Sequence, residues 1–147
     1  MANKKNLYYA YKAVATRIKK YFNSLPTEDT QLKLLDLGCA TGAFFDFFPD
    51  WDVYGIVLRE IAGKIAQEKY KNIFIGDMKD ADFEDSFFDC ITIQDALDHS
   101  NDPLYVVNHC YKLLKENGII VIKVHNINCL LANRPEENFM LLYHRGI

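Results

Sequence analysis

One short segment of the chain combines an acidic residue with two glycines directly after an apolar run. It reads LLDLGCATG over residues 34–42. Such an apolar run is typical of a strand that is covered on both faces. Glycine has no Cβ, so it allows positive φ and lets a ligand approach the main chain. The N–H groups of the helix start that follows attract negative charge. The segment therefore predicts a loop that binds a small molecule.

Other polar residues stand where further predicted strands end. Asp77, Asp95 and His125 each follow an apolar run, as Asp36 does. In open α/β sheets, ligands bind in the crevice beyond the carboxyl ends of the strands. We therefore expect these side chains to gather at one such crevice.

Hydrophobic periodicity predicts strands that alternate with helices. The expected strands span 32–37, 53–58, 72–75, 88–93 and 119–124, and the expected helices 6–23, 42–48, 59–70 and 103–115. Asp102 is the expected N-cap of the last helix, with Pro103 in its first turn. Residues 80–87 are expected to form a loop. This alternation predicts an α/β fold with a doubly wound, mainly parallel sheet and helices on both faces.

Length and composition restrict the classes of protein. The 147 residues suggest one domain, and the net charge of −3 without a long basic run indicates no nucleic-acid surface. The chain shows no signal-peptide pattern and no apolar run of the ~20 residues that a membrane helix needs. It has four widely spaced cysteines and no metal-binding pattern, which favours reduced thiols and a cytoplasmic location. The cysteines are Cys39, Cys90, Cys110 and Cys129.

Four segments resemble class I S-adenosylmethionine-dependent methyltransferases, above all the small-molecule branch that includes quinone-biosynthesis enzymes. They are LLDLGCATGAFF, VYGIVLREIAGKIAQEK, NIFIGDMKD and FDCITIQDALDHSNDPLYVVNHCYKLLKENGIIVIKVHN, in the family's order over about residues 32–126. The resemblance implies a Rossmann-like, S-adenosylmethionine-binding unit over 32–147. It also implies that residues 1–31 carry a helix that caps the cleft. The implied activity is methyl transfer to a small-molecule acceptor.

The resemblance also implies which residues hold the cofactor. Those around its methionine portion are Asp36, Gly38, Cys39, Ala40, Gly42, Gln94 and Asp95. The Asp36 carboxylate is expected beside the cofactor's ammonium group. At the purine end, Asp77 is expected to accept a hydrogen bond from the adenine amino group, and Met78 to pack on the ring.

The pair Asp98–His99 matches one that borders the place of methyl delivery in the family. His99 is the predicted base, because imidazole titrates near neutral pH, and His125 is the second choice. The tyrosines of the first helix are expected to roof the substrate pocket or to cover apolar surface. They are Tyr8, Tyr9 and Tyr11.

The chain departs from the family pattern at Val57. The family usually has an acid there, at the end of the second strand, which accepts both ribose hydroxyls of the cofactor. Valine accepts no hydrogen bond, and an unmet buried polar group costs about 1–3 kcal/mol. Either cofactor binding is weakened, or Glu60 or a water compensates, or the ligand is a different one.

The second departure is the C-terminal end. The family adds two further strands there, whereas residues 127–132 are expected to form a short helix and 139–143 a single strand. We therefore expect a sheet that lacks part of the usual C-terminal strand pair. An open edge is normally covered or paired, so residues 138–144 are a candidate for homodimerisation.

Three functional hypotheses remain open from the sequence. The first is an active methyltransferase, and the second is an inactive relative that serves as a binding or scaffold protein, which Val57 and the C-terminal end favour. The third is a dinucleotide-dependent oxidoreductase, although Ala40 interrupts the GxGxxG spacing and Val57 removes the acid for a nicotinamide ribose.

Overall fold

The computed structural model describes residues 4–26, 31–125 and 138–144, with the main chain alone for His125 and for 138–144. Helices, including short 3-10 helices labelled η, alternate with strands. In chain order the elements are α1 (Lys4–Asn23), β1 (Lys33–Leu37), η1 (Ala43–Phe47), β2 (Asp52–Val57), α2 (Glu60–Lys69), β3 (Ile73–Ile75), η2 (Met78–Asp80), β4 (Phe88–Gln94), η3 (Leu97–His99), α3 (Pro103–Leu113), β5 (Leu114–His125) and β6 (Asn138–His144).

The described strands form one sheet in the order β3-β2-β1-β4-β5-β6. Strands β1 to β5 are parallel, and β6 runs antiparallel to β5. Strand order reverses beside β1, since β2 and β4 flank it on opposite sides. This confirms the predicted doubly wound sheet and fixes the crevice at the carboxyl end of β1.

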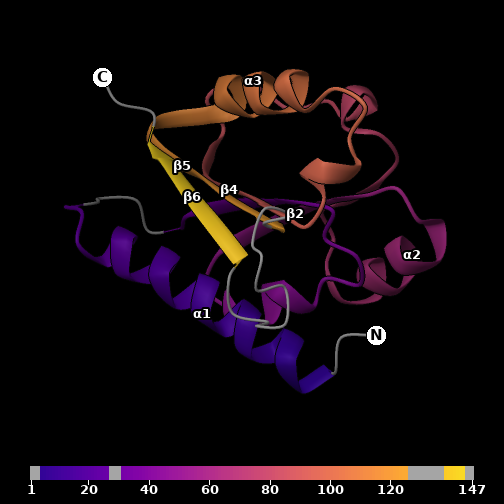
Figure 1. Ribbon diagram of the computed structural model, residues 1–147, viewed down its shortest axis with the longest axis horizontal. Coiled ribbons are helices and arrows are strands. Elements are labelled where there is room, and N and C mark those ends of the chain that lie inside the picture. The colour runs from indigo at the N-terminus through magenta and orange to yellow at the C-terminus, as the bar shows by residue number, and fades with distance from the viewer. Residues whose placement is uncertain (1–3, 27–30, 126–137, 145–147) are drawn as a thin grey trace.

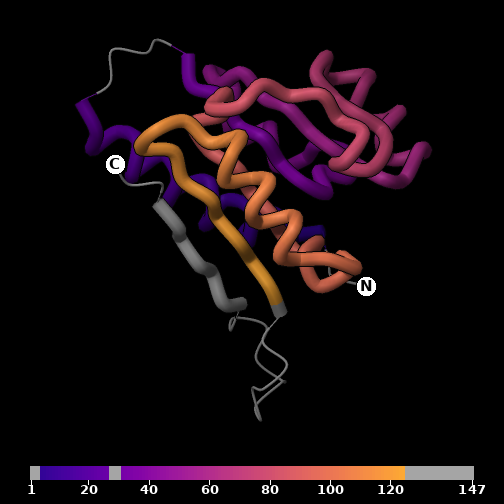
Figure 2. The backbone as a smooth tube through the Cα atoms, turned by 90° about the horizontal axis from the view of Figure 1, so that it is seen from above, coloured from indigo at the N-terminus to yellow at the C-terminus, as the bar shows by residue number. Residues whose placement is uncertain are grey.

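Helices cover both faces of the sheet. In Figure 1, α3 lies on one side of the strands and α1 on the other. The view in Figure 2, turned by 90°, shows α3 running alongside β5, which it also contacts. The arrangement follows from the sequence, because the central strands are apolar on both faces and must be covered on both.

Two separate clusters of buried side chains fill these faces. The α1 side contains Ile18 and Phe22 packed with Phe44 of η1, and the α3 side contains Leu113 packed with Ile91 of β4. Alternate residues of each strand point to opposite faces, so Leu34 belongs to the cluster on the α1 side and Leu35 to the cluster on the α3 side. The sheet is thereby held rigid beneath its loops.

The first helix packs close to the crevice. Val14 and Ile18 are buried, and the Tyr11 ring meets the Phe44 ring edge-on at 5.3 Å between centroids. Tyr8 and Tyr9 are about half exposed, at 51% and 56%. No residue of α1 is among those that line the cavity described below, so the cap that we expect of residues 1–31 stays a prediction.

The short helix expected at 42–48 is present as the 3-10 helix η1 over Ala43–Phe47. One expectation needs correction. Strand β5 begins at Leu114 instead of residue 119, because Leu114 already pairs with Phe88 before a register shift. Strand β6, which covers the strand expected at 139–143, pairs with β5 of the same chain, and homodimerisation through residues 138–144 stays a prediction. The expected helix at 127–132 lies outside the described residues.

Candidate functional site

A cavity of about 500 Å³ opens at the carboxyl ends of the parallel strands. Its lining comes from the segments that follow β1, β2, β3 and β4 and from the start of α3. These residues are Leu37, Gly38, Ala40, Ile56, Val57, Leu58, Arg59, Ala62, Gly76, Asp77, Met78, Lys79, Ile93, Gln94, Asp95, Ala96, Leu97, His99, Ser100, Asn101, Asp102, Tyr105 and Val106. The cavity therefore lies at the strand-order reversal, as the sequence predicts.

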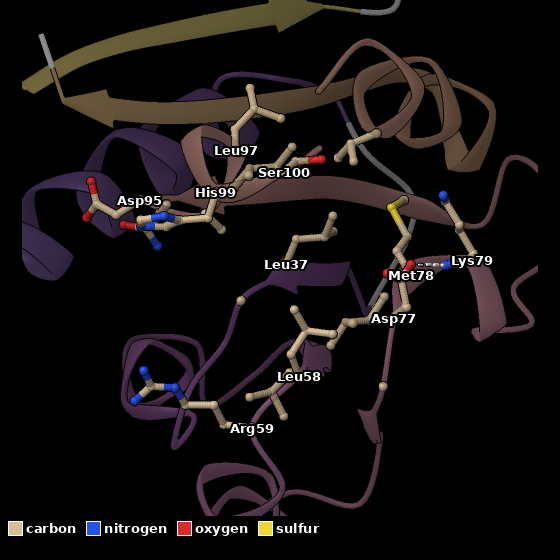
Figure 3. A pocket seen from close by; sticks show the side chains of 18 of the residues that line it. Leu37, Leu58, Arg59, Asp77, Met78, Lys79, Asp95, Leu97, His99 and Ser100 are labelled. Carbon is tan, nitrogen blue, oxygen red and sulfur yellow. Dashed lines mark hydrogen bonds between the residues drawn. The ribbon is translucent and has the colours of Figure 1, made fainter. Parts of the chain in front are cut away.

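Polar groups stand at the two ends of this cavity. Figure 3 shows Asp95 and His99 on one side, Asp77 and Met78 on the other, and Leu37 between them. The two ends belong to strands on opposite sides of β1, because Asp95 follows β4 and Asp77 follows β3. A ligand that touched both ends would have to cross the tips of β1 and β2.

The predicted site residues fall into two groups. Those that line the cavity are Gly38, Ala40, Val57, Asp77, Met78, Gln94, Asp95 and His99. Asp36, Cys39 and Gly42 are not among the lining residues: the first two are buried side chains at and just after the end of β1, and Gly42 is the N-cap of η1.

The loop after β1 needs its two glycines for conformational reasons. Gly38 and Gly42 have φ of +80° and +81°, which side chains rarely tolerate. A Cβ on Gly42 would also lie 2.9 Å from the Tyr70 ring. The loop is tied to β2, because the N–H groups of Gly38 and Cys39 donate to the Ile56 carbonyl at 2.9 and 3.1 Å.

Asp36 is a buried carboxyl group near the cavity floor. It is 4% exposed and accepts a hydrogen bond from Thr92 Oγ1 at 2.5 Å. Burial raises its pKa from 3.8 to about 7, and the neighbouring Thr92 and Gln94 side chains limit that rise. The group therefore changes charge near neutral pH.

Asp95 is held by a buried lysine of the next strand. Lys123 Nζ lies 3.1 Å from Asp95 Oδ2, and the Asp95 N–H donates to the Lys123 carbonyl at 2.9 Å. Asp95 has φ of +53°, a conformation that bends the chain sharply after β4. Asp36 and Asp95 also raise the pKa of the Tyr11 hydroxyl, after the larger effect of burial, to about 12. Tyr11 therefore stays neutral beside these acids.

Gln94 supplies a buried amide at the same end of the cavity. The side chain is 9% exposed, and its Oε1 and Nε2 atoms have no hydrogen-bond partner within the described part of the chain. Buried polar atoms are normally paired, so an unpaired amide that lines a cavity indicates a ligand group able both to accept and to donate. An amino-acid group has that combination.

The opposite end of the cavity is built on η2. Asp77 caps this 3-10 helix by accepting from the Lys79 N–H at 2.9 Å, and Met78 is buried. The Lys79 ammonium lies 5.2 Å from the centroid of the Tyr105 ring, which stacks on His109. These contacts join η2 to α3 and close this end of the cavity with an aromatic wall.

His99 lies at the end of η3 and is exposed to solvent. It lines the cavity on the Asp95 side, which is the place expected for a base that acts on an acceptor (Figure 3). Asp98 is exposed and is not among the lining residues. The side chain of His125, the second candidate base, lies outside the described residues.

The three cysteines that the structure describes do not provide a nucleophile. Cys39, Cys90 and Cys110 are buried free thiols, and Cys129 lies outside the described residues. Burial raises the pKa of Cys39 and of Cys110 to about 12, so both stay protonated. In the described ranges, no group of three or more His, Cys, Asp or Glu side chains is arranged to hold a metal ion, and no helix there has the length and apolarity to cross a membrane.

Sequence reasoning missed several residues in and around the site, and three of them make polar or aromatic contacts there. Thr92 and Lys123 are polar residues inside the apolar strands β4 and β5, and such interruptions are a signal that a buried partner exists. Tyr105 is placed by α3, and its contact with Lys79 is a tertiary one that no local pattern shows.

Known proteins are similar to this chain in sequence or in fold. MJ1123, an uncharacterized protein of Methanocaldococcus jannaschii, is 26% identical over 103 residues, which cover 70% of this chain and 49% of that protein. The structure of YcgJ from Bacillus subtilis has a TM-score of 0.61 and 22% identity, over 77% of this chain and 51% of that one. The plantazolicin methyltransferase BpumL, solved in complex with a pentazolic desmethylPZN analog and SAH, has a TM-score of 0.70 and 20% identity, over 85% of this chain and 49% of that one.

The chain spans about half the length of these relatives. A family model described as a methyltransferase domain matches residues 35–122, which run from β1 into β5 and include most of the cavity. Because this match covers more than half of the sequence, the chain belongs to the methyltransferase domain family.

Proposed function

We propose that this protein binds S-adenosylmethionine in the cavity and transfers its methyl group to a small-molecule acceptor. The observation that carries the proposal is that one cavity joins the Gln94–Asp95 end to the Asp77–Met78 end. Its volume of about 500 Å³ lies within the usual range of ~300–1,000 Å³ for small-molecule sites. The family match and the SAH bound to BpumL support the same cofactor.

The residues at the first end fit the amino-acid portion of this cofactor. The Gln94 amide offers an unpaired donor and an unpaired acceptor, which suit a carboxylate and an ammonium group. Asp95 and the buried Asp36 supply negative charge on the ammonium side. Gly38 lets the loop after β1 lie close to Ala96, since a Cβ there would lie 3.0 Å from the Ala96 Cβ.

The residues at the second end fit a purine. We assign Asp77 as the acceptor for the adenine amino group and Met78 as an apolar surface under the ring. The carboxylate of Asp77 has capacity left after it accepts from the Lys79 N–H, because each oxygen has two lone pairs. Leu58, which is 73% exposed and lines the cavity, would cover part of a bound ligand.

When bound, S-adenosylmethionine supplies a methyl group on a positively charged sulfur, which is already a good leaving group. The contribution of this chain is then to align the acceptor and to take up a proton where the acceptor carries one. We assign His99 as the base that takes up this proton. It lines the cavity on the Asp95 side and is exposed to solvent, to which it can release the proton. A location in the cytoplasm stays a prediction of the sequence.

Isothermal titration calorimetry with S-adenosylmethionine and S-adenosylhomocysteine tests the proposal. We expect micromolar binding of both ligands, about −8 kcal/mol. A matched control is Asp80→Asn, which changes an exposed acid of η2 outside the cavity and should bind as the wild type does. Absence of binding to the wild-type chain would refute the proposal.

A second candidate function is that of an inactive relative that serves as a binding or scaffold protein. Val57 favours it, because an apolar side chain lines the cavity where the family has an acid. The same calorimetry separates the two candidates. A scaffold without a cofactor would give no heat with either nucleoside, whereas an enzyme would bind both.

A further inference from the structure

We propose that Val57 makes the site indifferent to the ribose diol of its nucleoside ligand, so that the purine and the amino-acid group carry the affinity. This inference rests on the proposed function. With the amino-acid group beside Asp95 and the purine beside Asp77, the sugar lies between them, over the tips of β1 and β2. What these tips offer to a hydroxyl group therefore decides how the sugar is recognised.

The side chains at the end of β2 accept no hydrogen bonds. Ile56, Val57 and Leu58 line the cavity, and all three are aliphatic. Val57 is 5% exposed and packs in the core cluster on the α1 side of the sheet. Val57 thus places an almost fully buried apolar side chain at the end of β2, where the family has an acid.

The main chain at the same place is largely in use. The Ile56 carbonyl accepts from the N–H groups of Gly38 and Cys39, at 2.9 and 3.1 Å, which occupies both of its lone pairs. The Val57 carbonyl accepts from the Gly76 N–H at 2.9 Å, which leaves it one lone pair. These hydrogen bonds hold the loops after β1 and β3 against β2. A ligand hydroxyl that replaced one of them would break a contact that positions these loops.

The charged neighbours do not replace the missing acceptor. Arg59 lines the cavity, but a guanidinium group only donates hydrogen bonds. Glu60, the candidate substitute, is not among the lining residues, and its carboxylate pairs with Lys64 Nζ at 2.7 Å on the exposed side of α2. The acids that do line the cavity are Asp77, Asp95 and Asp102, which follow β3 and β4 or cap α3.

Two hydroxyl donors that leave water for this surface therefore gain no side-chain acceptor there, and the single lone pair left on the Val57 carbonyl cannot serve both of them. A hydroxyl group that is buried without a hydrogen-bond partner lowers the affinity of its ligand by about ten- to hundredfold. The two ribose hydroxyl groups therefore do not strengthen binding at this site. We infer that the specificity for a nucleoside resides in Asp77 and in the Gln94–Asp95 end. Val57 lets the sugar bind with or without its two hydroxyl groups.

Calorimetry on the wild-type chain with matched nucleosides tests this inference. S-adenosylhomocysteine is compared with its 2′,3′-dideoxy analogue and with S-inosylhomocysteine, which lacks the purine amino group. We expect the dideoxy analogue to bind within about threefold of the parent ligand, or more tightly, and the inosine analogue to bind at least about tenfold more weakly.

The outcomes separate this inference from the proposed function. If the parent ligand binds and the dideoxy analogue is at least about tenfold weaker, the inference is overturned and the proposed function stands. If no nucleoside binds, both are overturned.

Two variants sharpen the test. Val57→Thr adds a hydroxyl acceptor at nearly unchanged volume, and Val57→Asp adds a carboxylate. Each should create a preference for the ribose form over the dideoxy form, by a few-fold for V57T and by about tenfold or more for V57D. If the buried charge prevents V57D from folding, V57T alone still tests the inference. A folded variant with unchanged preference would contradict the assignment of Val57.

Discussion

Lys123 Nζ and Asp95 Oδ2 lie 3.1 Å apart, and the Asp95 N–H donates to the Lys123 carbonyl at 2.9 Å. The lysine side chain is only 8% exposed, whereas that of Asp95 is 34% exposed. The pair therefore joins a buried cation of β5 to an acid that lines the cavity. Because two bonds fix Asp95, its strained left-handed backbone is held in one conformation.

Lys123→Met should lower the free energy of unfolding by about 2–4 kcal/mol, because it removes the cation that balances a partly buried carboxylate. Chemical denaturation measures this change. In a double-mutant cycle with Asp95→Asn, the two substitutions should be coupled by about 1 kcal/mol or more, as expected for residues in direct contact.

Lys64→Met is the matched control for this experiment. It breaks a pair of similar length with Glu60, but both side chains are about two-thirds exposed, so the cost should stay below about 1 kcal/mol. Equal costs for K64M and K123M would contradict the assigned role of Lys123.

The parts of this fold that sequence reasoning predicted are those governed by local patterns. Asp102 and Pro103 start α3 as expected, and the Asp102 carboxylate accepts from the Tyr105 N–H at 2.9 Å. The apolar strands and the glycine loop also fall close to their predicted positions. Capping and periodicity depend on residues a few positions apart, so one sequence contains the necessary information.

The parts that were missed depend on contacts between distant segments. Leu114 joins β5 because Phe88 of another strand lies beside it, and no local feature indicates this. Likewise, Lys123 was read as part of an apolar strand, and its partner Asp95 follows a different strand. Side chains that meet across the sheet are set by register and burial, which a single sequence does not specify.

Asp36→Asn should change how stability depends on pH. Burial raises the pKa of Asp36 from 3.8 to about 7, so the folded state binds this proton more tightly than the unfolded state does. The free energy of unfolding of the wild type therefore falls as pH rises from about 4 to about 7. One pKa unit is worth about 1.4 kcal/mol, so D36N should be more stable than the wild type at pH 8 by a few kcal/mol.

The same variant should bind S-adenosylhomocysteine more weakly at pH 8, because it lacks the negative charge proposed to face the ammonium group. Urea denaturation from pH 4 to 8, with calorimetry at pH 8, measures both effects. Thr92→Val serves as a control, since it removes the Thr92 hydrogen bond but keeps the carboxyl group. A constant stability difference between D36N and the wild type across this pH range would refute the assignment.

His99→Gln should lower the rate of methyl transfer by about 10²–10⁴-fold for an acceptor that must lose a proton. Affinity for S-adenosylhomocysteine should stay within about twofold of the wild-type value, because His99 is proposed to act on the acceptor. Asp80→Asn, which changes an exposed residue outside the cavity lining, should keep most of the activity.

Asp77→Ala should weaken the binding of S-adenosylhomocysteine by about tenfold or more, because the adenine amino group would lose its acceptor. The substitution also removes the cap of η2, where Asp77 accepts from the Lys79 N–H at 2.9 Å. Asp77→Asn keeps an oxygen for that cap and separates the two effects, since it should retain stability while losing part of the affinity. Calorimetry with S-inosylhomocysteine tests whether the loss depends on the purine amino group. This ligand lacks that group, so the wild type and D77A should bind it with nearly equal affinity. If D77A instead lost the same affinity for both ligands, the role of Asp77 would be to stabilise η2 and not to bind the amino group.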